Sequence, residues 1–268
     1  MGKKKDNLKN GNYIIKNKEK LLYERKNKRK LKRLFFLSII MISTLVTLCF
    51  KLPYFNITTI EILGNKIVSK AEITDTAKIE MGSNIFYSSF TESNKQVIKN
   101  PYILGATFKK VLPNKIVINI EERVAVFYGK VNNIYYILDD KGVLLQKREN
   151  IKDMDLVNLI GFDYGKCQIG DLIVSEDNRK INIANEITNI TKNYKNTNGA
   201  TKITMVDVSN VLDVRVYAGE MCIKFGTTED LKNKFNKAIN IISEPKYKSA
   251  KGYVDVSFTG NPVVFIQQ

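Results

Sequence analysis

The chain of 268 residues contains no histidine, which excludes the Ser-His-Asp and Cys-His catalytic arrangements and removes the commonest zinc ligand. Its formal net charge is +16, from 43 Lys and Arg against 27 Asp and Glu. Most of this excess lies in residues 1–33, which carry fourteen Lys and Arg against three acids, a net charge of +11. The positive charge therefore marks an N-terminal tail rather than the chain as a whole.

An uncharged apolar segment of seventeen residues, 34–50, follows the basic tail directly. In hydrocarbon every backbone N–H and C=O group must bond within the segment, so such a run predicts a helix. The helix would be about 25 Å long, the short end of what a bilayer needs, and snorkelling of Arg33 and Lys51 can supply the difference. We therefore predict a single transmembrane helix over residues 34–50.

A cleaved signal is the alternative to an anchor, because it shares the same basic-then-apolar order. A signal peptide has a shorter apolar core that ends in small residues of the A-x-A type, and the segment after Thr47 offers no such site. A lipoprotein signal at Cys49 requires a small residue before the cysteine, where this chain has Leu48. We expect an uncleaved anchor.

The basic tail, residues 1–33, is predicted to be cytoplasmic, because positive charge that flanks a first span stays inside. Residues 51–268 are then on the extracytoplasmic side of the membrane. The Lys-, Asn- and Glu-rich composition of the tail predicts disorder. A basic run can also bind nucleic acid, but this one adjoins a membrane span, and we expect no nucleic-acid partner.

Residues 54–123 are predicted to form a small domain in the order strand, helices, strand, strand. The first strand alternates apolar and polar residues and ends at the turn Gly64-Asn65. Ser69 is the expected N-cap of the first helix, and Glu72 three residues later completes a capping box. The predicted strands are 57–63, 103–111 and 115–122, and the helices begin at residues 69 and 91.

From residue 124 the pattern changes to short apolar strands, which predicts a β-domain over 124–259 followed by a C-terminal strand and tail at 260–268. Gly142 lies in a hairpin loop where it is free to adopt a positive φ. The predicted strands are 125–128, 135–138, 143–146, 156–160, 204–208, 213–217, 221–225, 253–258 and 263–266.

Two helices are predicted within this β-rich part. One begins at an N-cap at Ser175 and extends to about residue 194. The other, residues 228–243, has Thr227 as its expected N-cap and Lys232, Lys234 and Lys237 on its exposed side. Its apolar stripe consists of Leu231, Phe235, Ala238, Ile239 and Ile242.

This order of elements resembles the FtsQ/DivIB family of bacterial cell-division proteins. Residues 60–65 (IEILGN), with Ser69 and Ile73 after them, are similar to the V-x-G-N…S…I opening of the family's POTRA domain. Asn100-Pro101-Tyr102 precedes residues 112–123 (LPNKIVINIEER), which match the family pattern L-P-N-x-(I/L)-x-I followed by E-R. Each motif is short, but their common order extends over some 200 residues.

The resemblance implies an α+β fold, in which a single transmembrane helix is followed by a POTRA-like domain and a β-rich domain with flanking helices. It implies a non-enzymatic bitopic scaffold of the divisome that docks other membrane-anchored division proteins outside the cell membrane and helps to regulate septal peptidoglycan synthesis. The implied partners are single-span coiled-coil proteins of the FtsL and FtsB/DivIC type. The alternatives are a membrane-anchored cell-wall enzyme and another POTRA-bearing envelope assembly factor.

The expected partner-binding site is the terminal strand pair, because the last strand of a chain often lies at a sheet edge, and an exposed edge can accept a strand from another protein. Nearby lysines would speed the encounter with acidic coiled-coil partners. The residues predicted for this site are Tyr253, Val254, Phe258, Val263 and Phe265.

A second candidate group is Glu121, Glu122 and Arg123, at the end of a strand of the small domain. They are either a solvated strand end or residues that orient the second domain against the first. A catalytic carboxylate pair is disfavoured, because neighbours on one strand point to opposite faces. The other acidic pair, Asp139-Asp140, lies in a hairpin loop where turn geometry alone favours aspartate.

Cofactor chemistry is not predicted. The sequence has no Gly-rich phosphate loop, metal-spaced cluster or nucleophile elbow, so we expect no cofactor and no metal site. Cys167 and Cys222 are distant in sequence and do not form a C-x-x-C pair. A disulfide between them is one reading, and two unpaired thiols are the expected one.

Overall fold

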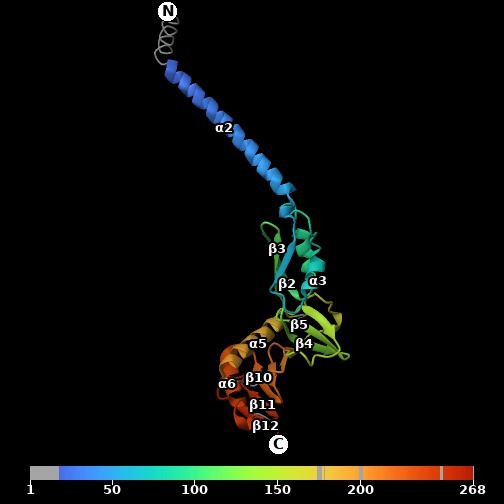
Figure 1. The fold of residues 1–268 in the computed structure, drawn as a ribbon. Coiled ribbons are helices and arrows are strands. Elements are labelled where there is room, and N and C mark those ends of the chain that lie inside the picture. Colours follow the sequence, from blue (N-terminus) through green and yellow to red (C-terminus); the bar gives the residue numbers. More distant parts are fainter. Residues whose placement is uncertain (1–17, 174–176, 178, 199–201, 248–249, 268) are drawn as a thin grey trace, which may run out of the picture. The chain divides into compact units, whose positions relative to one another are not determined.

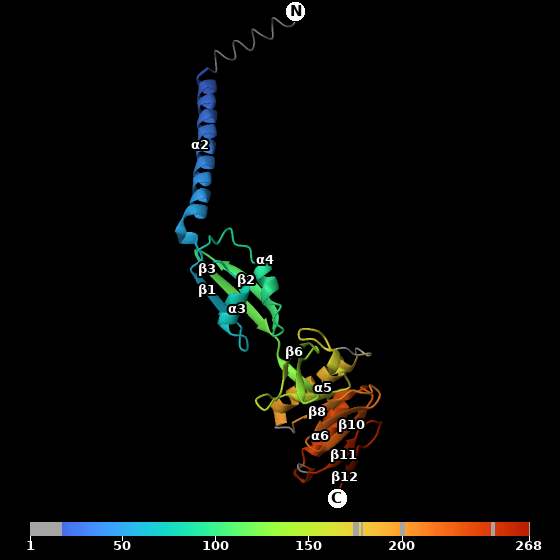
Figure 2. The same cartoon turned by 90° about the vertical axis from the view of Figure 1, so that its right-hand side faces the viewer.

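The computed structural model describes residues 18–173, 177, 179–198, 202–247 and 250–267 (Figures 1 and 2). It mixes helices and sheets, which confirms the predicted α+β class. The described chain separates into two compact units. One holds the residues up to Glu61 with Glu80–Ser89 and Lys109–Val117, and the other holds Ile62–Ile79, Phe90–Phe108 and the residues from Ile118 onward.

The N-terminal helix α2 (Lys18–Lys51) contains the whole predicted span. Its part from Leu22 to Lys51 is long and apolar enough to cross a membrane, and none of it is buried inside the protein. The helix begins well before residue 34, so the expected disorder is wrong for residues 18–33. Lys, Arg, Leu and Glu are good helix formers, and a helix already nucleated by the apolar run extends through them at little cost. Residues 1–17 lie outside the described part.

A short segment after α2 pairs with the loop of residues 80–89. The 3₁₀ turn η1 (Pro53–Phe55) leads into strand β1 (Thr59–Leu63). The N–H of Ile57 donates to the carbonyl of Ser83 (2.9 Å), and the N–H of Ile85 donates to that of Phe55 (2.9 Å). Both isoleucines are fully buried, so they form a small core beside the end of the long helix.

Strand β1 belongs to a three-stranded sheet in the order β1-β3-β2, in which β2 (Ile103–Val111) and β3 (Lys115–Glu122) have the predicted bounds. Helix α3 (Lys70–Ala77) begins after Ser69, whose hydroxyl accepts from the N–H of Glu72 (3.1 Å) and confirms the predicted cap. The capping box is only half formed, because the Glu72 carboxylate accepts from the Asn100 side chain (2.7 Å) instead of reaching back to the cap. Helix α4 (Thr91–Val97) begins at the predicted residue.

The remaining strands form one nine-stranded sheet in the order β12-β11-β10-β9-β8-β7-β4-β5-β6. The pairs β10–β11, β7–β8 and β4–β7 are parallel, and the others are antiparallel. Their bounds are β4 Ala125–Val131, β5 Ile134–Asp139, β6 Leu144–Arg148, β7 Val157–Ile160, β8 Met205–Asp207, β9 Val214–Ala218, β10 Met221–Gly226, β11 Gly252–Asp255 and β12 Val263–Ile266. Gly142 has a φ of 82°, as expected for its hairpin loop.

Helices α5 (Arg179–Asn198) and α6 (Leu231–Ile242) contact each other and pack with the sheet around one hydrophobic core (Figure 1). All five residues of the predicted stripe on α6 are buried. The expected cap at Thr227 is wrong, because Asp230 precedes the helix in a left-handed conformation. Lys234 is half-buried rather than exposed, since its ammonium donates to the carbonyls of Phe225 (3.1 Å) and Thr227 (3.0 Å) and fastens the turn before the helix.

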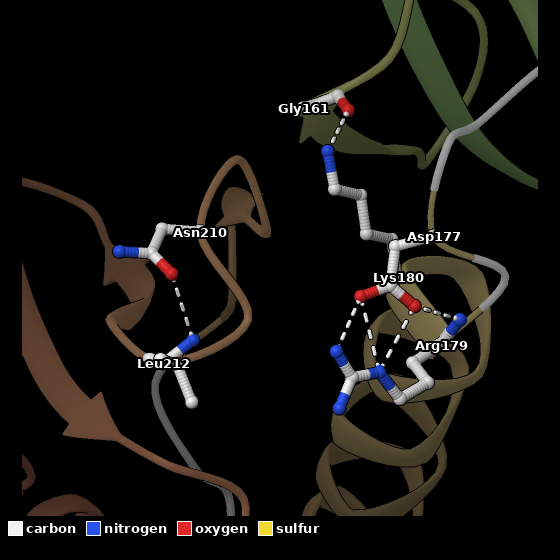
Figure 3. Close-up of polar contacts among 6 residues, drawn as sticks. All are labelled: Gly161, Asp177, Arg179, Lys180, Asn210 and Leu212. Carbon is white, nitrogen blue, oxygen red and sulfur yellow. Dashed lines mark hydrogen bonds and ion pairs between the residues drawn. The ribbon is translucent and has the colours of Figure 1, made fainter.

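The start of α5 is held by charged side chains (Figure 3). The predicted cap at Ser175 lies outside the described residues. The carboxylate of Asp177 accepts from the N–H of Arg179 (2.9 Å) and pairs with its guanidinium (2.7 Å), and the bonds from Arg179 lower the pKa of Asp177 to about 2. Lys180 donates to the carbonyl of Gly161 (3.0 Å), which joins the first turn of α5 to the residue after β7.

In the loop after β8, the Asn210 side chain accepts from the N–H of Leu212 (2.9 Å).

Candidate partner-binding edge

Strand β12 is an edge strand, as predicted, and its backbone polar groups alternate in direction. It pairs antiparallel with β11 in the register Tyr253↔Phe265 and Gly252↔Ile266. Just beyond it, the N–H of Gln267 donates to the carbonyl of Lys251 (2.8 Å), towards β11. Because direction alternates along a strand, the N–H and C=O groups of Val264 and Ile266 point away from β11. They form an open ladder for an incoming strand.

The opposite edge of the same sheet is better covered. At the start of β6, the N–H of Leu144 donates to the carbonyl of Asp171 (2.9 Å), and its own carbonyl accepts from Gly170 (2.8 Å). The N–H of Ile173 also donates to the carbonyl of Gly142 (2.8 Å). Proteins commonly shield sheet edges in this way. The uncovered edge at β12 is therefore the better candidate for docking.

The side chains of the terminal strands divide between the core and the surface. Val263 and Phe265 are about half exposed, at 49% and 51%; Phe258, 47% exposed, lies in the loop after β11 and not in the predicted strand 253–258. Tyr253 is half-buried and stacks on Phe265, with 5.3 Å between ring centroids. Val254 is fully buried in the core, so its expected contact with a partner is corrected: alternation along β11 directs it inward.

Lys224 is a residue of this surface that sequence reasoning missed. Its ammonium lies 3.6 Å from the centroid of the Tyr253 ring, an arrangement in which a cation is attracted to the ring face. The contact exists because β10 and β11 pair in the register Cys222↔Tyr253 and Lys224↔Asp255. The alternation of β10 could have placed Lys224 on a surface, but it could not have supplied this register.

Glu122 is bonded to the backbone of a loop that lies earlier in the chain. Its carboxylate accepts from three consecutive backbone N–H groups, those of Lys66 (2.9 Å), Ile67 (2.8 Å) and Val68 (2.9 Å). It thereby closes the loop between β1 and α3. Glu121 is exposed, as expected from the alternation of neighbouring residues on a strand.

Arg123 forms an ion pair with a buried aspartate. Its guanidinium donates to the carboxylate of Asp139 (2.7 Å), whose side chain is only 1% exposed. The other oxygen of Asp139 accepts from the N–H groups of Lys141 (2.9 Å) and Val143 (2.8 Å). Turn geometry alone therefore does not account for Asp139: it ends β5 as a buried anion whose charge Arg123 compensates. The N–H of Arg123 also donates to the carbonyl of Tyr102 (2.7 Å).

Replacing Glu122 by alanine is expected to destabilise the folded state by about 2 kcal/mol, because three N–H groups lose a charged acceptor. Glu121→Ala is the matched control on the neighbouring residue and should change the free energy of unfolding by no more than about 0.5 kcal/mol. Urea denaturation followed by circular dichroism measures both. Equal effects of the two variants would contradict the role given to the Glu122 carboxylate.

Within the described residues, no group of three or more His, Cys, Asp or Glu side chains is placed to hold a metal ion. Over the same residues, Cys167 is a buried free thiol and Cys222 a half-buried one. Burial raises the pKa of the Cys222 thiol.

Comparison with known proteins shows which proteins the chain is similar to. The FtsQ-type POTRA domain matches residues 55–123. The chain is 42% identical to the cell division protein DivIB of Clostridium botulinum (strain Hall) over 245 residues, which is 91% of this chain and 94% of that protein. It is 43% identical to DivIB of Clostridium acetobutylicum over 85% of this chain and 89% of that protein. It is 24% identical to the cell division protein FtsQ of Syntrophotalea carbinolica over 80% of this chain and 75% of that protein.

Proposed function

The chain belongs to the DivIB/FtsQ family of cell-division proteins, and from this premise we propose that it is a non-enzymatic, membrane-anchored scaffold of the divisome. It docks other membrane-anchored division proteins outside the cell membrane and so helps to regulate septal peptidoglycan synthesis. The observation that carries this proposal is the open edge of β12, with Val263 and Phe265 exposed beside it.

The partners in this proposal are single-span coiled-coil proteins of the FtsL and FtsB/DivIC type. An extended segment of such a partner would pair with β12 as a tenth strand, with its backbone bonded to Val264 and Ile266. Main-chain pairing of this kind supplies affinity, and the side chains beside the edge supply specificity. Phe265 and Tyr253 offer the aromatic surface that is enriched among strongly contributing interface residues.

The proposed orientation has the N-terminus in the cytoplasm and the two sheets outside. Support comes from the net charge of +11 in residues 1–33 directly before the apolar run, since Lys and Arg next to a first span are retained inside. The docking edge then lies on the side where the cell wall is built.

One member of each acidic pair considered as a catalytic candidate is bonded within the protein, which favours a scaffold over a cell-wall enzyme. Asp139 is neutralised by Arg123 and bonded to two backbone N–H groups. Glu122 is fully engaged by the loop after β1. Both carboxylates therefore have partners within the protein rather than facing a substrate.

A fluorescent fusion at the N-terminus of the full chain is expected to form a band at mid-cell in dividing cells. Deleting residues 260–268 should abolish co-purification of the partners and leave the protein in the membrane, because the deletion removes β12 but not α2. The measurement combines imaging with co-purification from solubilised membranes. A full chain distributed evenly around the envelope would contradict the division role, and unchanged co-purification after the deletion would contradict docking at the edge.

A further inference from the structure

A cluster of aromatic side chains surrounds the end of α2. The cluster, here called the aromatic collar, comes from three segments: the last turn of the helix, the 3₁₀ turn after it and the loop of residues 80–89. The Phe50 ring stacks on Tyr87 at 4.8 Å between centroids and meets Phe86 edge-on at 5.8 Å. Phe86 in turn lies 5.3 Å from Phe55, which contacts Tyr54 at 5.2 Å. The collar residues are Phe50, Tyr54, Phe55, Phe86 and Tyr87.

A side chain from the loop also fastens it to the helix. The last carbonyls of a helix have no partner within the helix and need one from elsewhere. The amide of Asn84 donates to the carbonyls of Cys49 (3.0 Å) and Phe50 (3.3 Å), while its oxygen accepts from the N–H of Phe86 (3.0 Å). The loop is therefore attached to the end of α2 by hydrogen bonds from the Asn84 side chain to backbone carbonyls, as well as by ring contacts.

Large apolar side chains of the collar and its surroundings are exposed. Tyr87 is 70% exposed and Tyr54 65%, and Leu52, Met81 and Leu112 are exposed as well. Exposed lysines occur in the same compact unit, at Lys51, Lys109 and Lys110. This mixture of Tyr, aliphatic side chains and Lys is typical of the boundary between lipid tails and headgroups.

The position of Phe50 identifies what covers this surface. Phe50 is the last residue of the seventeen-residue apolar run, so it lies at the edge of the hydrocarbon when α2 spans the membrane. A ring stacked on it at 4.8 Å lies at the same depth. We propose that the aromatic collar inserts into the interfacial layer of the membrane that α2 crosses. Asn84 holds the loop against the end of α2, so that the folded loop is anchored to lipid as well as the helix. The inference rests on the membrane anchoring that is part of the proposed function.

The chain has no tryptophan, so a single Tyr87→Trp substitution creates a specific fluorescent probe of the collar. The full-length variant is reconstituted into vesicles of phosphatidylcholine and phosphatidylglycerol whose acyl chains carry bromine at shallow or at deep positions. The emission of the introduced tryptophan is expected to shift to the blue on reconstitution and to be quenched more strongly by shallow than by deep bromine. A Phe258→Trp variant is the matched control at an exposed aromatic site and should be neither shifted nor quenched.

Flotation of the vesicles tests membrane anchoring by α2 separately from insertion of the collar. A Tyr87→Trp protein that floats with its vesicles while its emission stays red-shifted and unquenched would overturn the collar and leave the membrane anchor intact. A protein that does not float would overturn the anchor and the collar together. Quenching of the Phe258→Trp control as strong as that of the Tyr87→Trp variant would also overturn the collar, because it would indicate adsorption without a preferred site.

An Asn84→Asp substitution in the Tyr87→Trp chain tests whether Asn84 holds the loop against the end of α2. Aspartate keeps the oxygen that accepts from Phe86 but loses the amide hydrogens that reach the carbonyls of Cys49 and Phe50. The quenching of the introduced tryptophan by shallow bromine is expected to fall while the protein still floats. Unchanged quenching would overturn the role of Asn84.

Discussion

An Arg123→Ala substitution is expected to lower the free energy of unfolding of the outer region, residues 52–268, by about 3 kcal/mol, the cost of removing one partner from a buried ion pair. The Asp139 side chain is 1% exposed and would keep only its two backbone N–H donors. Urea denaturation at neutral pH, followed by far-ultraviolet circular dichroism, measures the loss.

Two further variants identify its cause. Adding Asp139→Asn to Arg123→Ala should recover part of the stability, because the neutral amide leaves no uncompensated buried charge and can still accept from Lys141 and Val143. Arg148→Ala is the control for an ordinary ion pair, since the side chain of its partner Asp153 is 63% exposed. It should cost less than about 1 kcal/mol. A double variant no more stable than Arg123→Ala would mean that lost packing, rather than lost charge, explains the effect.

The pair also bears on the proposed orientation of one domain against the next. Arg123 follows β3, and Asp139 ends a strand of the nine-stranded sheet, so the bond joins the two parts of the chain on either side of Val124. Of the three residues considered for this role, Arg123 is the one bonded to a residue after Val124, and its orienting role stays a prediction. Glu122 turns back to the loop after β1, and Glu121 is exposed.

An Ile266→Pro substitution is expected to weaken binding of a coiled-coil partner by about tenfold or more while the outer region stays folded. The N–H of Ile266 points to the open edge, so proline removes a donor to the incoming strand and not one to β11. The partner carbonyl left unpaired costs roughly 1–3 kcal/mol, and 1.4 kcal/mol corresponds to tenfold in affinity. Titration calorimetry with the outer segment of a candidate partner measures the change.

The matched control is proline one residue earlier. The N–H of Phe265 points towards β11, so Phe265→Pro should destabilise the terminal strand pair itself and lower the thermal midpoint, which Ile266→Pro should not do. Phe265→Ala removes the ring without touching the backbone and should reduce affinity by a smaller factor. Full binding by a folded Ile266→Pro variant would exclude strand addition at β12.

Local patterns in the sequence predicted a large part of the fold. The bounds of β2 and β3, the cap at Ser69 and the stripe of α6 follow from alternation, side-chain capping and a 3.6-residue period, all of which act over a few residues. The start of α2 was predicted wrongly, because the helix extends through the basic residues before the apolar segment. The start of α6 was predicted wrongly, because the bonds of Lys234 to Phe225 and Thr227 hold the turn before the helix. Family resemblance predicted membership in the FtsQ/DivIB family, and the comparisons confirm it.

The candidate site depended on information that a single strand does not contain. That β12 ends the sheet was predicted, but Val254 turned inward, because the face of the sheet that packs on the core decides which of the neighbours Tyr253 and Val254 is buried. Asp139 was assigned to a turn because its partner, Arg123, is sixteen residues away and belongs to another element. Lys224 was missed for the same reason, since its contact arises between two strands separated by a helix.

From the open edge of β12 we also expect a tendency to self-association. Unpaired N–H and C=O groups beside exposed Val263 and Phe265 accept any strand of suitable register, including the same edge of a second copy. Under the docking proposed above, we expect copies produced in excess of their partners to aggregate and copies with an occupied edge to be protected. Docking at this strand would make the solubility of the protein depend on the abundance of its partner.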